Sequence, residues 1–367
     1  MFGSKVQKCF SYSPGSGDFL SGHLLTQILL TAFFEVSLQI FINSSTVLCI
    51  FLHWRQLTLC LFVGLVSACG VSVLYNLLRV YHFIQTCRDS DTSAGESGQQ
   101  PPLRSSWRAA LQFWTLSALL SLVGSRVSSL IVLEFLLRAV SAWMTAGLNA
   151  GAGTLDLLLV QCQFSLGCSL LCTLAFLHQG APHSSLSLLL AAGLSWVVAS
   201  YSSSLWSHAA RLYPLHSTER YCGKCIHLLT SGHTLLASLQ RAVILAFAVG
   251  TVASTSTVYE HFLFHKDAIK FWTPLTLCYT MLVVFTQEDQ QRRAGTENLL
   301  HTVVMRLGGL LVLMLTVGNW SDVLHVLVSF LGEGVCLLSS GDLLQAALKD
   351  EQETSSSDRE ERSSHGT

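Results

Sequence analysis

Three rows of polar and ionisable side chains run at helical spacing through otherwise apolar stretches of the sequence. Residues three or four apart lie on one face of a helix, so the first row places a carboxylate and a guanidinium one turn apart. A charged side chain at the centre of a bilayer costs roughly 2.5–3.5 kcal/mol, so each such group needs a partner or an aqueous neighbour. The rows are Glu134, Arg138, Ser141 and Thr145; Asp322, His325, Ser329, Glu333 and Cys336; and Gln161, Ser165, Ser169 and Cys172.

These rows support two functional hypotheses. In the first, the protein carries or conducts a small solute or ion along a hydrated route. Glu333 and His325 would then handle protons or cations, and Glu134 with Arg138 would form a gate or a substrate contact. In the second, the protein is a non-catalytic scaffold or a subunit of a membrane complex, and the same groups lock its helices together. The candidate site residues are Glu134, Arg138, His325, Ser329 and Glu333.

Three charged positions have individual expectations. Glu333 is the strongest candidate because it lies between two glycines and has no basic residue one turn away along the sequence. Arg306 is expected near the cytosolic end of its helix, where its long side chain reaches the membrane surface. Asp322 follows Ser321, and the two are expected to form the first-turn acid and the cap of the last helix.

A polar connection contains a C-x-x-C pair, Cys222 and Cys225, with His216 and His227 close by. Four such ligands hold zinc tetrahedrally in structural sites. A single C-x-x-C without a second pair at standard spacing is a weak zinc signal, and it favours juxtamembrane cysteines that are free or lipid-modified. We therefore expect no metal and no cofactor, with these four residues as the zinc candidates.

Several classes of function are disfavoured by the sequence. No H-E-x-x-H, G-x-S-x-G, Walker or G-x-G-x-x-G pattern stands in a usable context, so the sequence indicates no enzyme. The formal net charge is -1 and there is no long basic run, which argues against nucleic acid as a partner. Most of the 12 cysteines lie inside apolar runs, where they pack as small hydrophobes and do not form a secreted disulfide framework.

The apolar runs that carry these residues dominate the composition. Hydrophobic residues make up 50% of the 367-residue chain and charged residues 12%, and the mean hydropathy is +0.49. Runs of about 20 residues match a hydrocarbon layer about 30 Å thick, where only helices satisfy their own backbone polar groups. We therefore predict an all-α polytopic transmembrane helix bundle of about eight or nine spans, with the lipid bilayer as its surroundings. The predicted core spans are 57–86, 107–123, 126–147, 155–178, 184–206, 237–258, 269–287, 299–318 and 321–346.

Two places leave the number of spans open. Residues 22–53 form a further apolar stretch that is one long tilted span or a hairpin. The stretches 107–123 and 126–147 are so close that they are two spans, one broken helix or a re-entrant pair. Residues 1–55 are therefore kept as a separate N-terminal region before a bundle over 56–347. The connection 89–106 and an acidic, Ser-rich cytosolic tail over 348–367 are expected to be disordered.

The basic residues predict the orientation of the bundle, because Lys and Arg in short connections favour the cytosolic side. If 107–123 and 126–147 are separate spans, most basic residues fall on one face, and the C-terminus is cytosolic. That face holds Arg88, Arg104, Arg108, Arg211, Arg220, Lys224, Arg292, Arg293 and Lys349, and the opposite face holds Arg126, Lys266 and Lys270.

Two rows of small residues spaced four apart predict helix–helix interfaces. Small side chains let helix backbones approach closely, which is the main source of contact where lipid removes the advantage of burying leucine. The rows are Gly64, Ala68, Ser72 and Asn76, and Ala242, Ala246, Gly250 and Ser254.

Short motifs spread over residues 57–346 form a recognisable set. They are V-G-S-R-V at 123–127 leading into L-E-F at 133–135, C-Q-F-S-L-G-C at 162–168, Q-G-A-P-H at 179–183, H-S at 216–217 with R-Y-C-G at 220–223, F-W-T-P-L-T at 271–276 and L-T-V-G at 315–318. Together they resemble the vertebrate transmembrane protein 82 family. The resemblance implies a multi-pass membrane protein and brings no activity, substrate or catalytic residue to carry over. Residues 1–55 diverge from the family pattern.

Overall fold

The computed structural model describes residues 57–88, 106–146, 152–218, 222–263 and 296–349, together with scattered positions between 271 and 285. The chain divides into two compact units, Met1–Thr58 and Leu59–Thr367, and the contacts below belong to the second. Expectations for the N-terminal region 1–55, the connection 89–106 and the tail 348–367 lie wholly or almost wholly outside the described residues.

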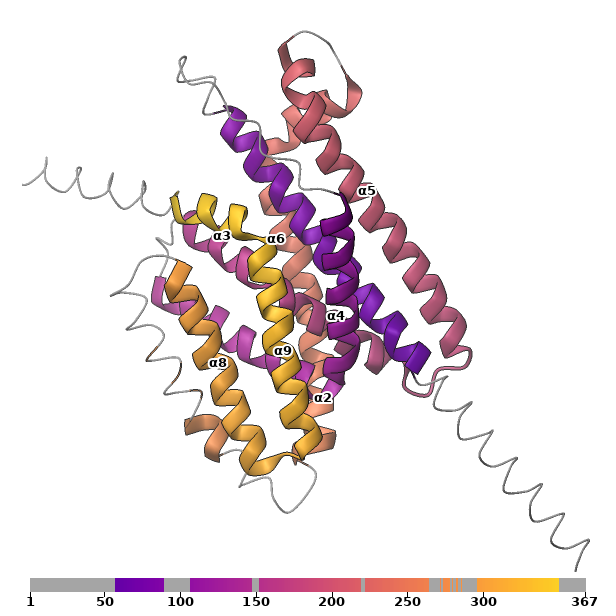
Figure 1. Cartoon of the computed structure of the whole chain (residues 1–367), viewed down its shortest axis with the longest axis vertical. Coiled ribbons are helices and arrows are strands. Elements are labelled where there is room, and N and C mark those ends of the chain that lie inside the picture. The colour runs from indigo at the N-terminus through magenta and orange to yellow at the C-terminus, as the bar shows by residue number, and fades with distance from the viewer. Residues whose placement is uncertain are drawn as a thin grey trace, which may run out of the picture. The chain divides into compact units, whose positions relative to one another are not determined.

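The regular structure of the described residues is helical, as predicted (Figure 1). A turn of π-helix, Tyr259–Leu263, extends α6, and residues 341–349 form a short helix after α9. The longer helices are Leu57–Arg88, α2 (Ser106–Ala146), α3 (Ala152–Gln161), α4 (Gln163–His178), α5 (Ser184–Thr218), α6 (Gly223–Val258), α8 (Thr296–Val317) and α9 (Trp320–Ser339).

By length and apolar composition, 6 helices among the described residues are able to cross a membrane, or up to 7 if the bent pair α3 and α4 is one span. The predicted count of eight or nine is not confirmed. The stretch 22–53 and much of 269–287 lie outside the described residues. The predicted spans 107–123 and 126–147 correspond to the two halves of α2, which are helices that meet at a kink without a connecting loop.

The interruption of α2 lies at Gly124. Its backbone has φ 72° and ψ 166°, a conformation that side chains with a Cβ essentially do not adopt. Glycine therefore permits a sharp change of direction without a connecting loop. The second half of α2, which carries Glu134 and Arg138, owes its direction to this residue.

The bend between α3 and α4 measures 57° and lies at Cys162, between two glutamines. A helix broken here turns both amide side chains inward. Gln161 accepts a hydrogen bond from Arg138 Nη1 at 2.7 Å. Gln163 is buried and donates through Nε2 to the Ser340 hydroxyl at 2.8 Å. The break therefore supplies polar partners at two points inside the bundle.

Small residues form the closest helix contacts, as the sequence predicts. A Cβ built on Gly250 of α6 would lie 1.6 Å from Ser169 Oγ of α4, and Ser169 donates to the Ala246 carbonyl at 3.2 Å. A Cβ on Gly64 would lie 2.6 Å from the Ser117 carbonyl oxygen of α2. Ala242 is the exception, because its side chain is exposed. The two predicted rows thus mark real interfaces, with one residue misplaced.

The helices differ in how deeply they are buried. α9 packs against α2, α4 and α8, and α2, α4 and α6 pack against one another (Figure 1). α5 and α6 are the least buried of the candidate spans. Large apolar side chains of α5 such as Leu190, Leu194 and Val197 are exposed, as expected for a surface in contact with lipid.

Candidate functional site

Charged side chains from α2, α8 and α9 meet inside the bundle. Arg306 Nε of α8 lies 3.0 Å from Glu134 Oε2 of α2, and Arg306 Nη2 lies 3.0 Å from Glu333 Oε1 of α9. All three residues are buried, and Arg306 is only 4% exposed. The prediction that Arg306 reaches the membrane surface is therefore wrong. The face of α8 that carries it is turned inward, so its guanidinium bridges two carboxylates that belong to different helices.

Arg138 completes this group. Its Nε lies 4.0 Å from Glu134 Oε1, one helical turn away, and its Nη1 is held by Gln161. We refer to Glu134, Arg138, Arg306 and Glu333 as the charge network. Its two acids and two bases cancel in formal charge, which is the condition under which buried ions are tolerated.

Two of the five predicted candidates lie outside the charge network. Ser329 is fully buried, but its hydroxyl donates to the Val326 carbonyl of its own helix at 2.5 Å. His325 is half-buried and lies beside the break in α2, where a Cβ on Gly124 would be 3.7 Å from its Nδ1. The predicted row along α9 is therefore a set of separate contacts and not a continuous polar surface.

A second ion pair lies where α9 begins. Asp322 is 1% exposed, and its Oδ2 lies 3.3 Å from Arg126 Nη2. The same carboxylate accepts the Asn319 backbone N–H at 3.1 Å as part of a capping box. The predicted role of Asp322 as the first-turn acid is confirmed, although the cap is Asn319 and not Ser321. Arg126 also stacks over the Phe262 ring at 5.1 Å.

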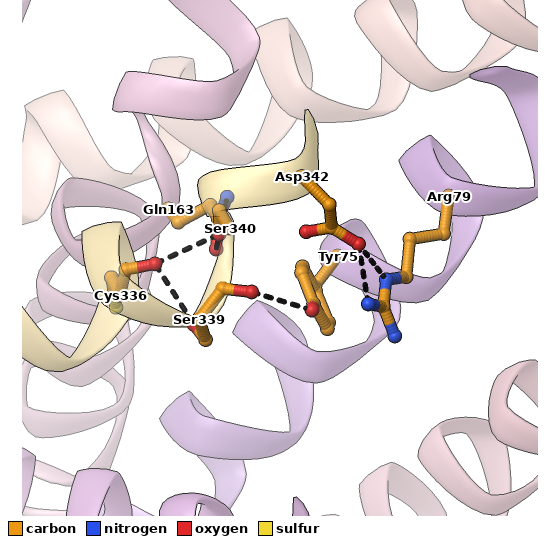
Figure 2. Close-up of polar contacts among 7 residues, drawn as sticks. All are labelled: Tyr75, Arg79, Gln163, Cys336, Ser339, Ser340 and Asp342. Carbon is orange, nitrogen blue, oxygen red and sulfur yellow. Dashed lines mark hydrogen bonds and ion pairs between the residues drawn. The ribbon is translucent and has the colours of Figure 1, made fainter. Parts of the chain in front are cut away.

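A third set of contacts surrounds the end of α9 (Figure 2). Arg79 pairs with Asp342, with Nε donating to Oδ2 at 3.0 Å. The Tyr75 hydroxyl donates to the Ser339 carbonyl at 2.7 Å, and the next residue, Ser340, is bonded to Gln163. Helix Leu57–Arg88, α4 and the end of α9 are thus joined by polar contacts at one level.

An apolar cavity of about 340 Å³ lies between α2, α3 and α6. Its walls include Phe135, Leu159, Val243 and Phe247, with Gln240 and Thr251 as polar members. None of the four charge-network residues lines it. This cavity therefore offers room for apolar groups and no contact with the buried ions.

The cysteines of the C-x-x-C pair meet two histidines at the shared end of α5 and α6. Cys222 is the N-cap residue of α6, and Cys225 lies in its first turn. His208 and His216 come from the last part of α5, and the four ligand atoms all lie within 4.8 Å of one another. We call His208, His216, Cys222 and Cys225 the Cys/His cluster.

Three of the four zinc candidates are in this cluster, and the fourth, His227, is not. Its exposed side chain lies two residues beyond Cys225 on α6, about 200° around the helix. His208 takes its place, about two helical turns before His216 on α5, in a position that sequence proximity to the cysteines does not reveal. The backbone N–H groups of Cys225 and Lys224 lower the pKa of the Cys222 thiol, as is typical at a helix N-terminus.

The apolar helices with ion pairs sealed between them are those of a multi-pass membrane protein. The family model for transmembrane protein 82 matches residues 58–358, and the chain belongs to this family. The match covers the described helices from residue 58 onward. No solved structure matches the chain.

Proposed function

We propose that this protein is a non-catalytic membrane scaffold or subunit, in which the charge network locks the helices together. The observation that carries the proposal is the pairing itself: Arg306 joins Glu134 to Glu333, and Arg138 balances the remaining charge. A substrate-binding ion is expected to face a route from the membrane surface. These four residues face one another instead, and none of them lines the apolar cavity.

The energetic basis is the asymmetry between breaking a buried ion pair and removing it whole. Removal of one partner leaves an uncompensated charge and costs about 3–5 kcal/mol, whereas replacement of both partners is often neutral. Arg306→Met leaves two acids against one base, and Glu333→Gln leaves two bases against one acid. The double variant R306M/E333Q keeps Glu134 and Arg138 and restores neutrality.

A double-mutant cycle tests this lock. The fraction of each variant that elutes as a monodisperse peak in detergent, and its midpoint of thermal unfolding, are measured by fluorescence-detected size exclusion. We expect R306M and E333Q each to lose most folded protein and R306M/E333Q to recover it. Leu311→Ala, a neighbouring apolar substitution on α8, controls for general loss of packing. A double variant that is no better than R306M would contradict the lock.

Transport of a small solute or ion is the second candidate function. One observation favours it: Glu333 Oε2 is buried and has no hydrogen-bond partner among the described residues, so this atom is able to accept a proton or a cation. Proteoliposomes separate the two candidates. We expect wild-type protein to leave the permeability to protons, alkali cations and small solutes unchanged. A flux that a folded R306M/E333Q variant abolishes would favour transport and overturn the scaffold.

We also propose that α2 crosses the membrane twice, with Gly124 at the turn, and that the C-terminus is cytosolic. Contacts along α9 support this arrangement. Gln112 of the first half of α2 bonds to Val335, Arg126 pairs with Asp322, and Glu134 is linked through Arg306 to Glu333. The chain thus runs toward the start of α9 before Gly124 and back toward its end afterwards.

Contacts between helices also indicate which basic residues lie on the same side of the membrane. Arg79–Asp342 brings the end of helix Leu57–Arg88 beside the end of α9, and Ile84 packs with Cys225 in a satellite apolar cluster. Arg88, Lys224 and Lys349 would then share one face, whereas Arg126 lies near the other. This distribution favours the predicted cytosolic face.

Epitope accessibility tests the orientation. An epitope on the C-terminal tail is expected to be protected in intact cells and stained once digitonin opens the plasma membrane. Staining in intact cells, or only after full detergent permeabilisation, would contradict a cytosolic C-terminus.

A further inference from the structure

The Cys/His cluster has the composition of a structural zinc site, because two thiols and two imidazoles are one of the standard tetrahedral ligand sets. In a tetrahedral site with Zn–S near 2.3 Å and Zn–N near 2.0–2.1 Å, neighbouring ligand atoms lie roughly 3.3–3.8 Å apart. His208 Nε2 lies 3.1 Å from Cys225 Sγ, His216 Nδ1 lies 3.2 Å from the same sulfur, and Cys222 Sγ lies 3.8 Å from His208 Nε2. These three distances are within a few tenths of an ångström of that range, and no two of the four atoms are more than 4.8 Å apart, so small side-chain adjustments would bring them to the corners of such a site.

Hydrogen bonding alone gives a poor account of this arrangement. A thiol is a weak donor and a weak acceptor, yet Cys225 Sγ is approached by two imidazole nitrogens at once. Both cysteines are free rather than joined in a disulfide. A cation at the centre would give each of the four atoms one strong partner.

We propose that His208, His216, Cys222 and Cys225 bind one structural zinc ion that joins the end of α5 to the start of α6. Cys225 is buried against Val80, Ile84, Ala209 and Leu228, which close the inner side of the site. The other three ligands are half-buried, so an ion reaches them from outside. Four protein ligands leave no open position for water, which makes the site structural and not catalytic.

A bound ion would hold the end of α5 against the start of α6. The apolar windows of α5 and α6 are the least buried among the candidate spans, and at their shared end a small apolar cluster that includes Val80, Ala209 and Tyr213 packs beside the ligands. Metal binding stabilises whatever conformation brings the ligands together. The ion would therefore fix the α5–α6 pair, independently of the charge network.

Metal content of the full-length protein tests the site. The protein is purified in detergent with a tag that contains no histidine run, incubated with Zn²⁺ and desalted, and zinc per chain is measured by plasma mass spectrometry. We expect about one tightly held zinc per chain in the wild type. We expect His208→Gln, His216→Gln and Cys222→Ser each to weaken zinc binding by more than about tenfold, as removal of a ligand requires.

Two matched controls come from the same chain. His227→Gln removes an exposed histidine from the same part of α6, and Cys60→Ser removes an exposed free cysteine. Both are expected to bind zinc as the wild type does. An equal loss in His227→Gln and His208→Gln, or a wild-type zinc content at the level of the buffer, would overturn the site.

Cobalt provides a readout that needs no variant. Co²⁺ in a Cys₂His₂ site is expected to give thiolate-to-cobalt charge-transfer absorption and tetrahedral ligand-field bands in the wild-type protein. Their absence in protein that elutes as a folded peak would overturn the site even if the ligand variants fail to fold. Because the site lies apart from Arg306 and Glu333, either result leaves the charge-network cycle to be judged on its own.

Discussion

Ionisable groups between α2, α8 and α9 meet partners of opposite charge, whereas those at the shared end of α5 and α6 are sulfurs and imidazoles that meet one another. In the first region each long side chain crosses from one helix to the next, as Arg306 does between Glu134 and Glu333. In the second region the contacts join groups that carry no complementary charge. The charged groups of the interior balance in formal charge, and the α5–α6 end has the chemistry of a metal-binding site.

The two regions also differ in packing. Around α4, glycines allow the neighbouring helices to approach closely, and Gly332 contacts Phe164 so tightly that a Cβ there would lie 2.3 Å from the ring. Along α5, Gly193 has open space around it, with no atom within 4 Å of a built Cβ. Several close helix–helix contacts therefore fix the positions of the interior helices. At the α5–α6 end, the Cys/His cluster lies beside a small apolar cluster that includes Val80, Ile84 and Tyr213.

Among the substitutions that test packing, the largest effect is expected from Gly250→Leu. A side chain here must displace Ser169, whose Oγ would lie 1.6 Å from the new Cβ, so we expect a loss of about 3 kcal/mol, at the upper end for overpacking. Val249→Leu is the matched control, because Val249 directly precedes Gly250 on α6 and is 46% exposed. The midpoints of thermal unfolding in detergent are compared. Equal stability of the two variants would contradict the close α4–α6 contact.

An intermediate effect is expected from the same substitution made at two glycines, Gly124 in α2 and Gly193 in α5. Gly124→Ala forces a Cβ into the conformation at φ 72° and should destabilise the protein by about 2 kcal/mol. Gly193→Ala lies in the regular part of α5 with space around it and should stabilise the helix by up to about 1 kcal/mol. The two unfolding midpoints should therefore move in opposite directions. A shift of the same sign in both would contradict the difference in packing and backbone conformation between these two glycines.

Most of the helices, and the polar residues that share a helix face, could be predicted from the sequence, because apolar runs and helical spacing are local properties. Glu134 and Arg138 were found in this way, since their contact lies within one helix turn. Arg306 was assigned to the wrong environment, because which face of α8 turns inward depends on helices that are distant in the sequence. His208 was missed for the same reason, since an antiparallel neighbour brings it to the cysteines.

Helix boundaries are also difficult to predict from local sequence patterns. The polar residues after Cys222 predicted a connection as far as Leu236, yet α6 begins at Gly223. Polar side chains on a helix that extends past the hydrocarbon layer give the same composition as a loop. The sequence indicates a break at Gly124. Whether α2 is one broken span or two spans joined by a turn depends on the direction of its second half, and no local sequence pattern predicts that direction.

The smallest effect is expected from Asp342→Asn. This ion pair with Arg79 lies at the edge of the interior, and the Asp342 side chain is 51% exposed, so water and salt screen it. Arg79 also stacks on Tyr75 at 4.7 Å and on Trp206 at 5.0 Å, and these contacts remain when the carboxylate is removed. We expect a loss of at most about 1 kcal/mol for Asp342→Asn. Arg79→Ala should cost more because it also removes the stacking. If Asp342→Asn instead proved as damaging as Arg79→Ala, the ion pair would be acting as the buried pairs of the interior do, and the boundary between the two regions would have to be moved outward.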